Sequence, residues 1–115
     1  MASSTIKRDN STKSKTIAFN AVNVASVSFV LPYTARWYGT ISTIAYTTGV
    51  NLNHDMYYFV ADSTNNEISI SKPLGENTGS GTFIIESATI SGNTVTLNFD
   101  ATHTFMGSIE MFVTN

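Results

Sequence analysis

Polar and apolar residues alternate with a period of two along most of this chain. In residues 94–99, Val95, Leu97 and Phe99 fall on one side and the Thr and Asn residues between them on the other. Residue types that suit a pleated surface, Ile, Val, Phe and Tyr, recur throughout the sequence. The pattern predicts an all-β protein.

Two hairpins are predicted where turn residues separate alternating segments. Residues 82–100 form the first, with Ser91, Gly92 and Asn93 at its turn. Residues 55–72 form the second, and its turn over residues 62–66 is rich in Asp and Asn, which tolerate left-handed backbone.

The alternation changes phase near Asn23, within residues 16–31. Either two short strands meet there or one strand carries bulges. Pro32 and Pro73 are both expected at strand ends, where a missing N–H costs no ladder bond. Counting the segments gives seven or eight short strands, which predicts an antiparallel two-sheet β-sandwich, of which the jelly roll is one form.

Basic residues are concentrated at the start of the 115-residue chain. Residues 1–15 hold four of the six basic groups: Lys7, Arg8, Lys13 and Lys15. Ser, Thr and Lys do not bury enough apolar area to fold alone, so we expect residues 1–15 to be a polar arm. The arm is either a solvated tail or a segment that docks on a partner. Residues 16–115 are expected to form a single domain.

The remaining charge argues against nucleic acid as a partner of the domain. Residues 16–115 contain only Arg36 and Lys72 as basic groups against seven acidic residues, which repel phosphate. No apolar run approaches the roughly 18 residues of a membrane span. The absence of Cys excludes disulfides and thiolate metal sites and leaves the compartment undecided.

No motif for catalysis or metal binding stands out. His54 and His103 are the only imidazoles, no nucleophile and base share a recognised spacing, and both His residues are expected at the surface or in turns. We therefore expect no enzyme, no cofactor and no metal. Residues 62–67 carry six oxygen-bearing side chains that suit calcium, but a hairpin turn requires the same residue types, and both interpretations stay open.

Aromatic residues are the best candidates for a contact surface, because they combine flat apolar faces with polar tips. In residues 37–46, Trp37 and Ile41 share the side expected to face the core, whereas Tyr38 and Tyr46 share the other. Arg36 lies at the edge of that second side. The candidate binding residues are Arg36, Trp37, Tyr38, Tyr46, Tyr57, Tyr58, Met106 and Phe112.

In its layout the chain resembles small bacteriophage virion proteins and tail-fibre or baseplate domains. The resemblance lies in Thr/Ser/Asn-rich strands without Cys, which follow a polar arm and end in GSIEMFVTN. It implies a non-enzymatic structural or attachment protein of the virion that forms symmetric oligomers, often trimers, with arms that clasp neighbours. Other virion proteins and a host glycan or receptor are the implied partners.

A carbohydrate-binding module or lectin-like domain is the alternative. Such a domain would be secreted or extracellular, and Trp37 or the Tyr pair would stack on the sugar.

Overall fold

The computed structural model describes residues 13–47, 51–77 and 84–114, with the side chains of 45–47, 51–53, 73–77 and 114 left out of the description. This part of the chain confirms the all-β prediction. It forms six strands: β1 (Ser14–Val30), β2 (Arg36–Thr47), β3 (Asn51–Asp62), β4 (Glu67–Asn77), β5 (Ile85–Ser91) and β6 (Thr94–Thr114). No helix in these ranges is long and apolar enough to cross a membrane.

All strand pairs are antiparallel and belong to one sheet. The order is β1-β6-β2-β3-β4, and β5 pairs with β6 off this path. The two separate sheets of the predicted sandwich are therefore not seen, and the prediction of seven or eight strands is wrong.

Strand continuity explains the smaller number. The sequence pattern shows two separate alternating segments, residues 94–99 and 104–113. In the structure both belong to the single strand β6. The phase change near Asn23 marks irregularities within one strand, because β1 runs from Ser14 to Val30 with register shifts on both sides of Val24. Asn23 adopts a left-handed φ of 54° there.

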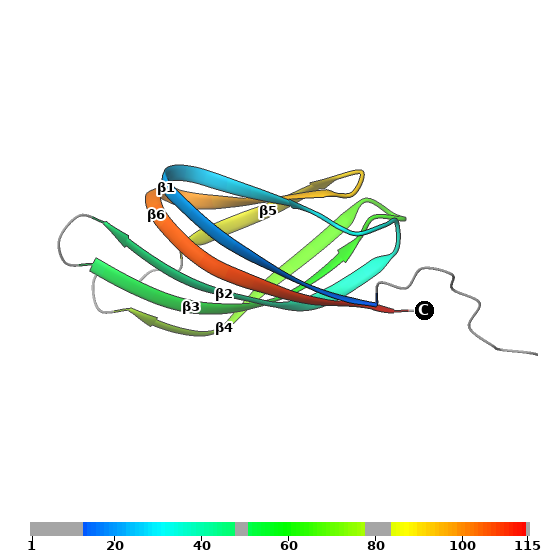
Figure 1. Cartoon of the computed structure of the whole chain (residues 1–115), viewed down its shortest axis with the longest axis horizontal. Coiled ribbons are helices and arrows are strands. Elements are labelled where there is room, and N and C mark those ends of the chain that lie inside the picture. The colour runs from blue at the N-terminus through cyan, green and yellow to red at the C-terminus, as the bar shows by residue number, and fades with distance from the viewer. Residues whose placement is uncertain (1–12, 48–50, 78–83, 115) are drawn as a thin grey trace, which may run out of the picture.

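The sheet folds back on itself where β1 and β6 bend together. Before the bend of β6, residues 94–99 lie between β5 and the end of β1; after it, residues 104–114 lie between the start of β1 and β2. The two halves of the sheet face each other in Figure 1, with β5, the start of β6 and the end of β1 above β2, β3 and β4, while the start of β1 and the end of β6 continue into the lower half.

The apolar core lies between these halves. Its largest fully buried side chains are Trp37, Tyr57, Phe105, Leu31, Ile41, Ile84, Ile85, Leu97, Ile109, Met111 and Val95. They come from strands of both halves, so each half covers the apolar side of the other.

Both predicted hairpins are confirmed. Gly92 turns β5 into β6 with a φ of 60°, and Asn66 turns β3 into β4 with a φ of 56°. Pro32 follows the end of β1 as expected. Pro73 instead lies within β4, in an edge strand, beside a register shift between Met56 and Tyr58 of β3, where a missing N–H is tolerated.

The expected boundary between arm and domain is not tested. Lys7 and Arg8 lie outside the described residues. Lys13 and Lys15 are exposed, and β1 already begins at Ser14.

Candidate functional site

The solvent-facing side of β6, β2 and β3 carries an unusual number of exposed apolar side chains. We call this side the outer sheet face, and define it by Tyr38, Ile44, Tyr58, Val60, Met106 and Phe112, which are all exposed. Alternation along each strand places these residues opposite the core-facing ones. The face is thus the reverse side of the sheet that covers the core.

Register brings the aromatic members of the face together. Tyr38 lies opposite Phe112 of β6 on one side and Val60 of β3 on the other. The rings of Tyr38 and Phe112 are 5.8 Å apart at an angle of 39°. Tyr58, two residues before Val60 on the same strand, extends this aromatic row.

A second apolar pair lies farther along the same strands. Ile44 of β2 is directly opposite Met106 of β6. Thr40 and Ser42 of β2 separate this pair from Tyr38, with Glu110 and Ser108 opposite them. On β2 and β6 the outer sheet face therefore has apolar ends and a polar middle with one carboxylate, whereas on β3 Tyr58 lies opposite Thr40 and Met56 lies opposite Ser42.

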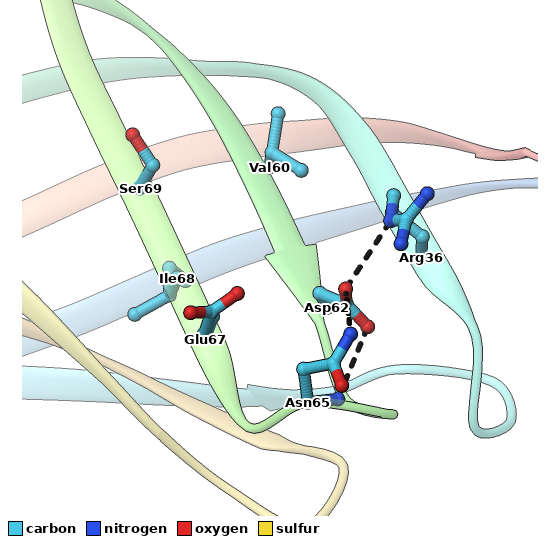
Figure 2. A pocket seen from close by; sticks show the side chains of 7 residues that line it. All are labelled: Arg36, Val60, Asp62, Asn65, Glu67, Ile68 and Ser69. Atoms are coloured by element: carbon cyan, nitrogen blue, oxygen red, sulfur yellow. Dashed lines mark hydrogen bonds and ion pairs between the residues drawn. The ribbon is translucent and has the colours of Figure 1, made fainter.

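A hollow of about 620 Å³ adjoins the aromatic end of the face. It is lined by Arg36, Val60, Asp62, Asn65, Glu67, Ile68 and Ser69, which Figure 2 shows on β2, β3 and β4 and the turn between the last two. Its lining combines two carboxylates, a guanidinium, an amide and a hydroxyl with two aliphatic side chains.

Asp62 organises this hollow. Its Oδ2 accepts hydrogen bonds from Arg36 Nε at 3.2 Å and Asn65 Nδ2 at 2.9 Å, as Figure 2 shows. Its Oδ1 accepts from the backbone N–H groups of Thr64 and Asn65. The side-chain hydrogen bond from Asn65, with a smaller contribution from Arg36, lowers the pKa of Asp62 from its usual value, because these donors favour the ionised carboxylate.

These contacts bear on the calcium alternative for residues 62–67. Asp62 fixes the turn from β3 to β4, which is the role that its residue type predicts for a hairpin. In the described ranges, no group of three or more His, Asp or Glu side chains is placed to hold a metal ion.

The structure divides the candidate binding residues between surface and core. Tyr38, Tyr58, Met106 and Phe112 lie on the outer sheet face, and Arg36 lies at its rim in an ion pair with Asp62. The backbone of Tyr46 pairs with Leu52 and Thr104, and its side chain is outside the description.

Trp37 and Tyr57 are both buried in the core, which leaves neither side chain available at the surface. Trp37 donates its indole N–H to the carbonyl of Tyr33 at 3.0 Å, and the Tyr33 ring packs edge-on against it at 5.2 Å. The stacking of Trp37 on a sugar is thus excluded in this structure.

A buried polar cluster, which the sequence does not indicate, surrounds Tyr57. The Tyr57 hydroxyl donates to Asp55 Oδ2 at 2.9 Å and accepts from the N–H of Ile85 at 3.1 Å. Asp55 Oδ2 also accepts from the N–H of Ile84 at 3.2 Å, and among the described residues its Oδ1 has no hydrogen-bond partner. Burial raises the pKa of Tyr57 well above its ordinary value, so the phenol stays neutral.

The two imidazoles lie on opposite sides of the sheet. His54 is exposed on β3, whereas His103 is buried at the bend of β6, contrary to the expectation of a surface position. His103 Nε2 is 2.7 Å from Asp100 Oδ1, and its ring packs against Phe99. The contact between His103 and Asp100 helps to hold the bend, because it joins two residues of β6 that lie on either side of the bend.

Comparison with known families and curated proteins finds no match. Among solved structures, the chain is similar to the crystal structure of the Acinetobacter phage vB_ApiP_P1 tailspike protein, with a TM-score of 0.41 and 16% sequence identity. The match covers 100% of this chain and 24% of the tailspike chain, so this chain spans about a quarter of that protein's length.

Proposed function

We propose that this protein is a non-enzymatic structural or attachment component of a virion, which works by forming homo-oligomers and by binding through its outer sheet face. The observation that carries the proposal is the exposure of Tyr38, Tyr58, Val60 and Phe112 side by side. Contiguous exposed apolar patches rimmed by polar groups are typical of protein interfaces. The virion setting is supported by the layout of the sequence, and a trimer is the favoured oligomer on the same ground.

The composition of the face favours a protein partner. Aromatic side chains and Met are enriched at the centres of interfaces, where charges are scarce. The outer sheet face has Tyr, Phe and Met with Glu110 as the carboxylate between its two apolar ends. Partners in this proposal are further copies of the chain, other virion proteins and a host receptor.

The proposal is tested with the double variant Tyr38→Ser/Phe112→Ser, which removes the packed ring pair. We expect sedimentation velocity to show self-association weakened at least about tenfold, since two central aromatic contacts are lost. Val30→Ser is the matched control, because Val30 is exposed on the other half of the sheet. A wild-type protein that stays monomeric at high concentration, or a double variant that associates normally, contradicts the proposal.

Glycan binding is the second candidate function, and the hollow beside the aromatic row favours it. Sugar sites pair an aromatic face with converging carboxylate, amide and hydroxyl groups, and Tyr58 lies on β3 two residues before Val60, which lines the hollow together with Asp62, Asn65 and Glu67. A glycan array distinguishes the two candidates. Binding that is lost in Glu67→Gln and in Tyr58→Ala, but retained in Val30→Ser, supports the glycan function, and an array without signal contradicts it.

A further inference from the structure

One edge of the sheet is open along an entire strand. Among the described residues, β1 pairs with β6 alone, so its other side carries backbone groups without strand partners over residues 14–30. A free edge of this kind is a template for another strand.

Register identifies which residues direct their backbone groups to the free side. Val113 N–H donates to the carbonyl of Lys13 at 3.2 Å, in line with the pairing of Ser14 with Phe112. Hydrogen-bonded pairs alternate with non-bonded pairs in an antiparallel ladder. Odd residues of this segment therefore bond to β6. The backbone groups of the even residues face outward, and these are Ser14, Thr16, Ala18 and Asn20, all of them exposed.

The opposite edge of the sheet is protected by contrast. β4 contains Lys72 and Pro73 and a register shift against β3, and each of these features hinders the addition of a strand. β1 has no proline and no charged residue after Lys15. β1 has register shifts on both sides of Val24, but residues 16–21 lie before them and therefore lack the features that keep an edge strand single.

We propose that β1 of one copy pairs antiparallel with β1 of a second copy around a two-fold axis at Ala18, which makes one continuous sheet from two chains. Ala18 is the middle one of Thr16, Ala18 and Asn20, which are the residues after Lys15 that direct their backbone groups outward in the regular segment before the bulge. An interface of this kind is isologous, because each copy offers the same strand.

Self-pairing suits the side chains of this segment. Thr16 of one copy lies opposite Asn20 of the other, and Lys15 lies opposite Ala21, so no like charges meet. Ile17 and Phe19, which are only partly buried at the rim of the core, come together on the inner side and cover that rim. On the other side the two outer sheet faces become neighbours, because β6 with Met106 and Phe112 is next to β1.

The first test is Ala18→Pro. Proline removes the outward N–H of Ala18 from both copies while every N–H that bonds to β6 remains. We expect the dimer dissociation constant to rise about tenfold or more in sedimentation equilibrium, with an unchanged far-ultraviolet circular dichroism spectrum. An Ala18→Pro variant that is folded and dimerises like the native protein overturns the proposal.

A charge test covers the case in which Ala18→Pro fails to fold. Thr16→Lys/Asn20→Lys sets lysines opposite each other across the axis, whereas Thr16→Lys/Asn20→Glu sets opposite charges there. We expect the first double variant to be monomeric and the second to dimerise. Val30→Lys, exposed on β1 beyond both register shifts, is the control that retains the dimer. Equal association of the two double variants contradicts the proposed register.

This inference rests on the proposed function only for oligomerisation, and its two-fold contact makes a dimer in place of the trimer that the layout of the sequence favours. The outcomes are separable. If the edge variants associate normally while Tyr38→Ser/Phe112→Ser does not, the edge pairing is wrong and the outer sheet face stands. If the edge variants alone lose association, the role of that face in self-association is wrong and the edge pairing stands.

Discussion

Tyr57 and Tyr58 are adjacent residues of the same type with opposite surroundings. Tyr57 is 0% exposed and Tyr58 is 52% exposed, because successive side chains of β3 point to opposite sides of the sheet. The Tyr57 hydroxyl makes its hydrogen bonds to groups of the protein, whereas Tyr58 is exposed to solvent on the outer sheet face. Residue type alone therefore does not decide whether a tyrosine stabilises the fold or forms the surface.

Tyr57→Phe is expected to lower the free energy of unfolding by about 2–4 kcal/mol, because it leaves the Ile85 N–H without its buried partner and removes one of the two hydrogen bonds to Asp55 Oδ2. Tyr58→Phe is the matched control and should change that free energy by less than about 0.5 kcal/mol. Urea unfolding of both variants measures the difference. Equal stabilities would show that the buried hydroxyl contributes nothing.

Asp62 makes the stability of the folded protein depend on pH. Its pKa is lower in the folded chain than in the unfolded chain, so the stabilisation is present above about pH 4 and is lost as the pH falls through the folded value. Asp62→Asn should therefore be less stable than the wild type at pH 7, and the gap should close as the pH falls below about 4. Thermal unfolding of both proteins from pH 7 to pH 2.5 measures this, and a constant gap would assign the loss to some other contact.

At the scale of the elements, Gly39 allows β2 and β6 to approach. A Cβ at this position would collide with the carbonyl oxygen of Glu110 and lie 2.9 Å from the Cα of Met111, so backbone must move to admit it. The same holds for Gly107, where a Cβ would lie 2.6 Å from the carbonyl oxygen of Ser42. Gly39 and Gly107 are therefore needed because β2 and β6 approach too closely at these positions to admit a Cβ, and not because the backbone adopts a positive φ.

Gly39→Ala should lower the free energy of unfolding by about 3 kcal/mol or more, at the upper end of overpacking costs. Gly92→Ala is the contrasting variant, since Gly92 has open space around it and a φ of +60°. Its cost should be about 1 kcal/mol, from the left-handed backbone alone. Guanidinium unfolding compares the two, and a Gly39→Ala variant as stable as Gly92→Ala contradicts the steric account.

The sequence predicts elements well where alternation is regular. Both hairpins, their turns, and the division of Trp37 from Tyr38 between core and surface follow from period two and turn residues. Strand number does not follow, because β1 and β6 bend at Asn23 and near His103, where the alternation breaks and a bent strand looks like two short ones.

The candidate site is predictable to the same extent. Parity indicated Tyr38 as an outward residue, but its assembly with Tyr58, Val60 and Phe112 into one row depends on strand order, which the sequence does not contain. Contacts between distant segments are not predictable either. The Asp55 carboxylate meets the Ile84 N–H only because the sheet folds over.

For the whole molecule, β6 is the central element. It pairs with β1 along one edge and with β5 and then β2 along the other. Native-state hydrogen exchange should therefore show the slowest exchange in β6 and at least about tenfold faster exchange in β4 and β5, each of which pairs with a single strand in the part of the chain that the structure describes. Equal protection across all strands would indicate that exchange requires global unfolding.

The pairing of β1 and β6 also decides how the molecule bears a mechanical load. Ser14 lies opposite Phe112, so the start of β1 and the end of β6 are adjacent. A pull that separates these two points strains one ladder bond at a time, and the strands come apart like a zipper at low force. A force applied by a partner bound to the outer sheet face is instead shared among β6, β2 and β3, because all three strands contribute to that face. The unfolding force is therefore expected to be higher when the load is applied through the outer sheet face than when it is applied at the start of β1 and the end of β6.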